Sequence, residues 1–275
     1  MKPLLKRTLF GAIYVATIVF PLLFVPALFP FFVILYTTGM MAEYLKISVG
    51  RDLPDLPKVL AFIFSLTLFI TVLYVFCCGA DVKWLFLCLI PLAAIFASMI
   101  PNHGKFDAYT KLFFGLVYIA VPCGLSPILV YRGDGFDGKI MLCFFILIWA
   151  ADVGAYLLGS ALGQRPGARK LAPEISPKKS WWGFAGAVII STAVSIVLQL
   201  TGLFAVPLVH AVVLGPLFGV CAVAGDLVES IWKRHFGVKD SGNAIPGHGG
   251  FLDRLDSSIF TFPIAAVYLI LFNIL

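Results

Sequence analysis

Residues 139–162 read KIMLCFFILIWAADVGAYLLGSAL, an almost uninterrupted apolar run whose only carboxylate is Asp152. A helix rises about 1.5 Å per residue, so about 20 such residues cross the hydrocarbon core of a bilayer. We therefore predict a transmembrane helix here. An ionisable side chain inside such a helix costs free energy unless it faces a cavity or a polar partner. Asp152 is accordingly expected to line a polar cavity open to the cytoplasm, with an interhelical hydrogen bond as the alternative.

The rest of the chain has the same apolar character. Of its 275 residues, 61% are hydrophobic and 12% are charged, and the mean hydropathy is +1.01. A soluble domain is about half apolar and about a quarter charged. We therefore predict an all-α integral membrane protein with about nine transmembrane helices. The candidate spans lie near residues 8–25, 29–45, 58–78, 83–100, 110–131, 139–162, 182–201, 205–226 and 256–274.

The distribution of Lys and Arg predicts the orientation of these spans. Cytoplasmic loops of membrane proteins carry an excess of both residue types. With the N-terminus in the cytoplasm, all but three of the 20 basic residues fall on the cytoplasmic side, the exceptions being Lys83, Arg132 and Lys139. We therefore expect a cytoplasmic N-terminus and an external C-terminus. The first span lacks a clear small-residue cleavage site, so we interpret it as a membrane helix and not as a signal peptide.

Two long polar loops on the predicted cytoplasmic side, residues 163–181 and 227–255, hold nine of the 20 basic residues. Their position divides the chain into an N-terminal part that contributes membrane helices (1–135) and a C-terminal part that we expect to carry the chemistry (136–275). The net charge is +6, but the basic residues are spread between apolar runs and form no continuous basic face. Nucleic acid is therefore not an expected partner.

Carboxylates gather at the cytoplasmic ends of the last two predicted spans. Asp226 and Glu229 lie one helical turn apart, and so do Asp253 and Asp256. Between the two pairs runs a glycine-rich turn, residues 247–250, whose backbone N–H groups can approach an anion closely. Ordinary interfacial charges would not explain carboxylates on both sides of such a turn. Carboxylates, basic residues and a glycine-rich turn are the parts that hold a metal–triphosphate complex.

Residues 230–256 resemble the signature of the phosphatidate cytidylyltransferase (CDP-diacylglycerol synthase) family. That signature runs Ser-x-apolar-Lys-Arg, then Lys-Asp-x-small, then apolar-Pro-x-His-Gly-Gly-apolar-x-Asp-Arg-apolar-Asp. Every specified position fits except Trp232, where a smaller apolar side chain is expected. A match with this many polar positions is far more specific than a short motif. Trp232 is expected to change packing more than chemistry.

Two further segments, residues 152–159 (DVGAYLLG) and 175–181 (ISPKKSW), are similar to other parts of the same family. Trp182 departs from the family pattern, because a Glu is expected after Trp181. The contribution of that carboxylate is absent or comes from another residue. The resemblance is close in the C-terminal half, whereas the N-terminal spans agree in hydropathy alone.

The resemblance implies transfer of CMP from CTP to phosphatidate, giving CDP-diacylglycerol and pyrophosphate, with Mg²⁺, either alone or together with a second cation. The attacking phosphate oxygen is already anionic at neutral pH, so alignment and charge neutralisation should suffice without a strong general base. The metal ligands would be Asp226 and Asp253, with Asp256 in support. The expected triphosphate contacts are Lys239, Arg254, Gly247, His248, Gly249 and Gly250, and the expected contacts to lipid or nucleotide phosphate are Ser176, Lys178 and Lys179, with Asp152 lining the cavity.

The sequence leaves two alternative functions open. A related enzyme could use CTP with an ether-linked or polyprenol lipid. A secondary transporter would also have many spans and an intramembrane carboxylate, but it should show paired broken helices and internal symmetry. No such symmetry is visible here. The expected partners are CTP, phosphatidate and membrane lipid, the resemblance allows a homodimer, and the expected location is the cell inner (cytoplasmic) membrane.

Overall fold

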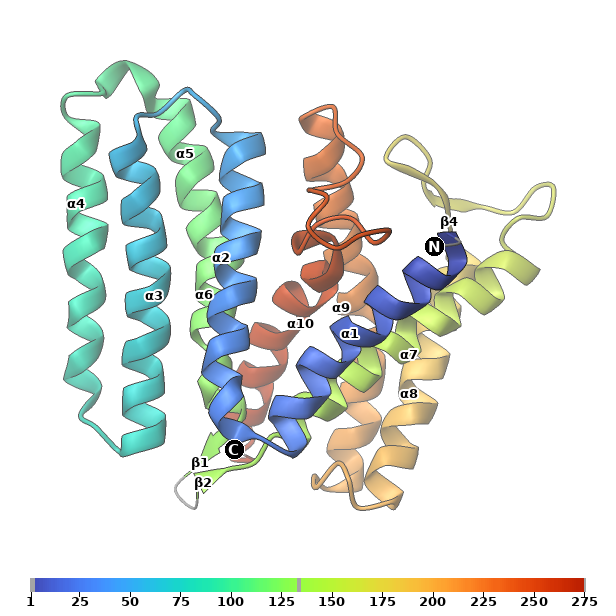
Figure 1. Ribbon diagram of the computed structural model, residues 1–275. Helices are drawn as coiled ribbons and strands as arrows, with labels where there is room; N and C mark the ends of the chain where they lie inside the picture. The colour runs from blue at the N-terminus through green and yellow to red at the C-terminus, as the bar shows by residue number, and fades with distance from the viewer. Residues whose placement is uncertain (1–2, 133–134, 275) are drawn as a thin grey trace. The chain divides into compact units, whose positions relative to one another are not determined.

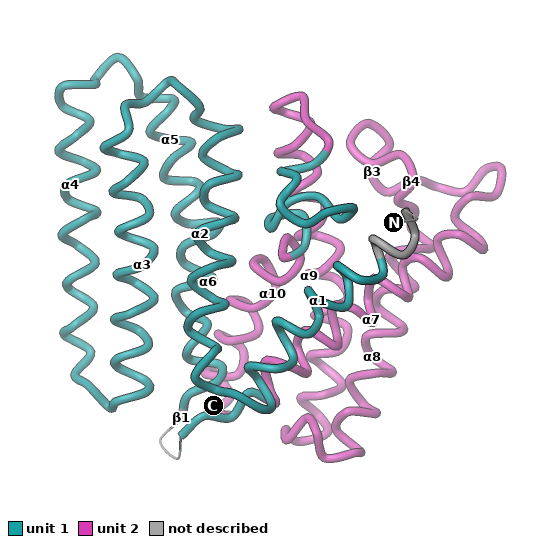
Figure 2. The backbone as a smooth tube through the Cα atoms, viewed as in Figure 1, with its two compact units in different colours: residues 1–138, 240–254 teal, residues 139–239, 255–275 magenta. Residues whose placement is uncertain are grey.

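The computed structural model describes residues 3–132 and 135–274. Lys2, one of the basic residues behind the predicted orientation, lies outside them. The described chain is largely helical (Figure 1). It forms two compact units, coloured separately in Figure 2: unit 1 is Met1–Gly138 with Asp240–Arg254, and unit 2 is Lys139–Lys239 with Leu255–Leu275. Loop 240–254 therefore packs with the N-terminal helices, although the predicted functional division placed it with the C-terminal part of the chain.

Unit 1 is built from helical segments joined by short turns. Its fifth predicted span is not one regular helix, because π-type pairing at Leu116–Ala120 precedes Pro122, which lacks a backbone donor. The elements are α1 (Pro3–Leu23), η1 (Pro26–Leu28), α2 (Phe29–Ser48), α3 (Asp55–Cys78), η2 (Val82–Cys88), α4 (Leu89–Met99), η3 (His103–Lys105), α5 (Phe106–Gly115), η4 (Leu116–Ala120), α6 (Val121–Gly124), η5 (Ser126–Leu129) and the hairpin β1 (Tyr131–Arg132) and β2 (Gly135–Phe136).

Unit 2 holds the remaining elements, and α7, α8 and α9 run side by side within it (Figure 1). Its elements are α7 (Lys139–Ala161), the antiparallel strands β3 (Lys170–Ala172) and β4 (Ser176–Ser180), α8 (Trp181–Leu200), α9 (Leu208–His235) and α10 (Leu252–Leu271), the last of which begins in unit 1.

Small residues allow the close packing of these three helices. A Cβ added at Gly154 of α7 would lie 2.3 Å from the carbonyl oxygen of Gly186 of α8. Across the next interface, Ser191 Oγ donates a hydrogen bond of 2.8 Å to the carbonyl oxygen of Gly215. In lipid, burying apolar side chains between helices gives little net driving force, so helices associate through close packing of small residues and through interhelical hydrogen bonds.

Eight described helical segments are long and apolar enough to cross a membrane, and Thr8–Leu23 is a shorter apolar helix. Each of the nine predicted spans coincides with one of these segments, but the count of nine spans and the sides of the termini stay predictions. The eight segments are Pro26–Ser48, Asp55–Cys78, Val82–Met99, His103–Leu129, Lys139–Ala161, Trp181–Leu200, Leu208–His235 and Leu252–Leu271.

The main difference from the sequence prediction is the length of α9. The predicted span ends at residue 226, whereas the helix continues to His235. Hydropathy marks only the part of a helix that suits hydrocarbon, so it misses a polar extension. The basic residues Lys233, Arg234 and His235 occupy the last turn, where cations interact favourably with the helix dipole. The extension places Glu229 and Lys233 on a regular helix and not in a loop.

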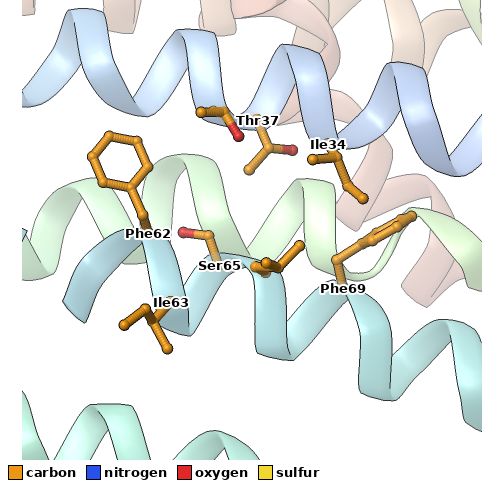
Figure 3. Close-up of a pocket in the computed structure, with 8 residues that line it drawn as sticks. Ile34, Thr37, Phe62, Ile63, Ser65 and Phe69 are labelled. Atoms are coloured by element: carbon orange, nitrogen blue, oxygen red, sulfur yellow. The ribbon is translucent and has the colours of Figure 1, made fainter. Parts of the chain in front are cut away.

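A pocket of about 220 Å³ lies between α2 and α3 in unit 1. Figure 3 shows Ile34 and Thr37 of α2 and Phe62, Ser65 and Phe69 of α3 around it. All eight lining residues are uncharged. This pocket is therefore unsuited to phosphate or metal ions.

Candidate functional site

An acidic cluster forms in unit 2 where α9 meets α10. Among the described residues, Asp226, Glu229 and Asp256 each offer a carboxylate oxygen, and these oxygens lie within 4.8 Å of one another. The Glu229 residue is 1% exposed, whereas the Asp226 side chain is 42% exposed. The cluster therefore reaches from the protein interior to an accessible edge. Three hard oxygen ligands at this spacing can bind a divalent cation such as Mg²⁺.

The close approach of the two helices brings these carboxylates together. A Cβ added at Gly225 of α9 would lie 2.9 Å from the carbonyl oxygen of Asp256 and 2.9 Å from Cβ of Phe260 on α10. Ser257 Oγ also donates a hydrogen bond of 3.1 Å to the carbonyl oxygen of Ala222. The residue beside Asp226 is thus a glycine because only hydrogen fits between the two backbones.

Two lysines accompany the cluster. Lys179 Nζ lies 2.7 Å from Asp226 Oδ2, and Lys233 Nζ lies 2.6 Å from Glu229 Oε2 one helical turn away. Asp152 of α7 and Lys233 are both near enough to interact with the charge of Asp256. The four carboxylates therefore outnumber the two ammonium groups.

The hairpin β3–β4 positions Lys179. Successive side chains of a strand point to opposite faces, so Lys178 is exposed while Lys179 is turned toward Asp226. Gln164 Nε2 donates a hydrogen bond of 2.9 Å to the carbonyl oxygen of Lys178, which ties the strand to the end of α7. Ser176 is half-buried at the start of β4, opposite Ala172. The three predicted phosphate contacts thus lie on one strand, with one lysine in the cluster and one in solvent.

The strand ends in a helix cap. Ser180 Oγ accepts a hydrogen bond of 3.1 Å from Gly183 N at the start of α8. Trp182, which stands where the family pattern predicts a Glu, is 49% exposed in this first turn. A carboxylate there would interact favourably with the helix dipole, and α8 has no acidic residue in its first turn to take that place.

The glycine-rich turn lies in unit 1 and is held by Asp253. Gly247 and Gly249 have φ of 82° and 89°, a region where other residues are strained. Asp253 Oδ2 accepts hydrogen bonds of 2.8 Å from Gly250 N and 2.8 Å from Ser241 N. These contacts place Asp253 against the turn. Its predicted role as a metal ligand stays a prediction, because the acidic cluster described above is formed by Asp226, Glu229 and Asp256.

Glu43 of α2 also contacts this turn, and the sequence analysis missed it. Its Oε1 accepts a hydrogen bond of 3.0 Å from Phe251 N, and its Oε2 accepts one of 3.0 Å from Leu252 N. A signal was present in the sequence, because Glu43 interrupts the apolar run 29–45 as Asp152 interrupts the run 139–162. An ionisable residue in such a run usually has a partner.

Three other predicted site residues, Lys239, Arg254 and His248, are not members of the acidic cluster. Lys239 and Arg254 have exposed side chains, and Tyr14 Oη donates a hydrogen bond of 2.9 Å to the carbonyl oxygen of Arg254. The His248 ring lies against α1, where a Cβ added at Gly11 would be 3.3 Å from its Nε2. The substrate contacts of these three residues stay predictions.

Known proteins with similar sequences point to one family. The pattern of the Cytidylyltransferase family matches residues 5–272. A phosphatidate cytidylyltransferase of Bacillus subtilis is 32% identical over 276 residues, which is 99% of this chain and 100% of the relative. An enzyme of the same name from Staphylococcus saprophyticus is 42% identical over 155 residues, which is 56% of this chain and 56% of the relative. One from Mycobacterium bovis is 39% identical over 158 residues, which is 57% of this chain and 49% of the relative. With a family match from end to end and a full-length relative above 30% identity, the chain belongs to the cytidylyltransferase family.

Proposed function

We propose that this enzyme transfers CMP from CTP to phosphatidate, yielding CDP-diacylglycerol and pyrophosphate, in the cytoplasmic membrane of a bacterial cell. The observation that carries the proposal is the full-length similarity to the Bacillus subtilis phosphatidate cytidylyltransferase. Many membrane-length helices suit an enzyme whose acceptor is a lipid. The alternative acceptors, an ether-linked or a polyprenol lipid, have no observation in their favour.

Asp226, Glu229 and Asp256 are the residues that would hold Mg²⁺ in this proposal. The donor set fits the ion, because Mg²⁺ prefers carboxylate oxygens and the three oxygens lie within 4.8 Å of one another. A bound Mg²⁺ would neutralise charge on the phosphate oxygens. Lys179, already at Asp226, would add a cationic contact to a phosphate, while Lys178 and Ser176 on the same strand would orient it.

The glycine-rich turn, Asp253 and Arg254 of unit 1 and Lys239 of unit 2 have a different part in this proposal. The glycine-rich turn would contact a phosphate oxygen through backbone N–H groups, as the sequence pattern predicts. Arg254 and Lys239, both exposed, would neutralise further phosphate charge. Because the attacking oxygen of phosphatidate is already ionised, these residues need only bind, orient and neutralise. Asp253 would keep the turn in shape through its hydrogen bonds to Gly250 N and Ser241 N.

The proposal predicts a specific reaction in detergent solution. Purified protein with labelled CTP, phosphatidate and Mg²⁺ should release pyrophosphate and lipid-soluble CDP-diacylglycerol in equal amounts. EDTA should abolish both products and added Mg²⁺ should restore them, because the carboxylate cluster needs its cation. Product with a polyprenol phosphate but none with phosphatidate would reassign the acceptor. Folded protein that consumes no CTP with any lipid would refute the enzyme proposal.

The reaction is proposed to take place on the cytoplasmic side, where CTP is available. The support is the excess of Lys and Arg in the loops on the same side as residues 163–181 and 227–255. In this orientation α3 runs outward, so Cys77 and Cys78 at its C-terminal end should face the outside. Both thiol residues are exposed, whereas Cys88, Cys143 and Cys221 are buried.

Thiol labelling of intact cells therefore tests the orientation. A membrane-impermeant maleimide should label the wild-type protein from outside, because Cys77 and Cys78 are exposed at that membrane surface. The Cys77→Ser/Cys78→Ser variant should lose this labelling and keep its activity, since neither residue belongs to the proposed site. Labelling that requires permeabilised cells would invert the orientation and remove the proposal of a cytoplasmic site.

A further inference from the structure

Loop 240–254 belongs to unit 1 (Figure 2), where it contacts one face of α2. Tyr36, Gly39 and Glu43 lie at spacings of three and four residues, so they share that face. The rings of Tyr36 and Phe251 meet edge to face with centroids 5.6 Å apart. A Cβ added at Gly39 would lie 2.4 Å from Cδ2 of Phe251. Phe251 is therefore seated in a space that only a glycine leaves open.

Glu43 supplies the polar part of the same contact. Its two oxygens accept hydrogen bonds from Phe251 N and Leu252 N, each 3.0 Å long. Leu252 is the first residue of α10, where backbone N–H groups have no partner within the helix. A carboxylate at this end also interacts favourably with the helix dipole. A residue about 200 positions away in the sequence thus supplies the hydrogen-bond acceptor for the start of α10.

Ser241 joins Glu43 to Asp253. Its Oγ lies 2.9 Å from Glu43 Oε2 and 3.0 Å from Asp253 Oδ2. A hydroxyl has one proton, so it donates to one of the two carboxylates at a time and can accept from neither. The backbone N–H of Ser241 donates to Asp253 as well, at 2.8 Å. The shape of the glycine-rich turn therefore depends on Glu43 as well as on Asp253.

Two glycines of the signature are explained by Glu43. A Cβ added at Gly242 would lie 2.5 Å from Glu43 Oε1, and one added at Gly250 would lie 2.3 Å from Glu43 Oε2. Contacts this short do not occur between a Cβ and an oxygen, so the carboxylate occupies the space of both missing side chains. The small residues of loop 240–254 are thus complementary to a carboxylate on α2.

We propose that Glu43 is a positioning residue for CTP, which presets the glycine-rich turn by holding the amides of Phe251 and Leu252. This inference rests on the proposed function, in which the turn contacts the triphosphate. Glu43 itself touches no substrate in this scheme. It acts by keeping the backbone N–H groups of the turn in the geometry that binds phosphate, so its loss should weaken binding of the nucleotide and not of the lipid.

The test is Glu43→Gln, because Gln keeps the shape but replaces one acceptor oxygen with an NH₂ group that cannot accept from a backbone N–H. The KM for CTP should rise about tenfold, the equivalent of one charged hydrogen bond, while the KM for phosphatidate stays the same. Amide hydrogen exchange should become faster in peptides that cover residues 247–253 and stay unchanged elsewhere. Glu174→Gln, at an exposed position of the β3–β4 turn, is the matched control and should behave as wild type.

The two readouts separate the possible failures. Unchanged exchange and an unchanged KM for CTP in Glu43→Gln would overturn the inference. Faster exchange throughout the protein, with both KM values raised, would show a purely structural role and overturn it too. If the wild type turns over no CTP, the proposed function fails, while exchange at residues 247–253 still decides whether Glu43 holds the turn. If Glu43→Gln does not fold, Ser241→Ala should give the same CTP-selective rise, and its absence would contradict the proposal.

Discussion

Asp226→Asn should lower kcat by about a thousandfold, because the variant loses both a proposed cation ligand and the charge that places Lys179. Asp226 is the most accessible carboxylate of the pair on α9, with a side chain 42% exposed beside the 1% of Glu229. Its Oδ2 lies 2.7 Å from Lys179 Nζ. Asn offers one neutral oxygen in place of two charged ones, so it binds Mg²⁺ weakly and leaves the ammonium group without its counter-ion.

The measurement is steady-state turnover of CTP with phosphatidate over a range of Mg²⁺ concentrations. Half-maximal activity should require more Mg²⁺ in Asp226→Asn than in the wild type. Asp55→Asn is the control, because its side chain is 94% exposed and pairs with Lys58 at 3.0 Å, a contact of little energetic weight. The double variant Lys179→Gln/Asp226→Asn removes both charges, so its thermal unfolding, compared with that of Asp226→Asn, shows how much stability the unpaired lysine costs. Wild-type turnover in folded Asp226→Asn would refute the metal assignment.

Gly250→Ala should lower kcat/KM for CTP by about a hundredfold, because a shift of about 1 Å in a substrate-positioning turn has an effect of this size. The added Cβ would lie 2.3 Å from Glu43 Oε2 and 2.3 Å from Ser241 Oγ. Gly250 does not have a positive φ, so alanine suits its backbone and the variant tests space alone. The turn must move away from Glu43, and it takes Asp253 with it.

Gly104→Ala is the matched control for this change. Nothing lies within 4 Å of a Cβ added at Gly104, and its φ is likewise ordinary. Both variants should be compared by thermal unfolding in detergent as well as by kinetics with CTP and with phosphatidate. An unchanged kcat/KM for CTP in Gly250→Ala would show that the turn adapts at no cost, and it would contradict a preset phosphate contact.

Hydropathy located the membrane helices because an apolar segment in a bilayer must still satisfy the hydrogen bonds of its backbone. Each N–H and C=O group in hydrocarbon needs a partner within its own segment, so an apolar run of sufficient length becomes a helix. The run 139–162 accordingly became α7, Lys139–Ala161. The rule says nothing of polar extensions, which is why the continuation of α9 to His235 and the hairpin β3–β4 were not predicted.

Helical periodicity also predicted part of the site. Asp226 and Glu229 are one turn apart in sequence, and both belong to α9 and to the acidic cluster. The sequence predicted Asp226 and Asp253 as the metal ligands with Asp256 in support, and Asp253 and Asp256 both lie at the start of α10. Packing gives the two carboxylates different contacts: Asp253 contacts Ser241 and Gly250, and Asp256 joins the acidic cluster.

The sequence by itself determined the membrane character, the helical segments and the family, because these depend on local composition and on a contiguous signature. The tertiary structure alone decided which distant residues meet. Glu43 accepts hydrogen bonds from Phe251 N and Leu252 N because Gly39 leaves room for the Phe251 ring. Asp226 lies close to Asp256 because Gly225 lets α9 and α10 approach each other. Such contacts depend on the complementary volumes of side chains from separate helices, which no pattern along one segment records.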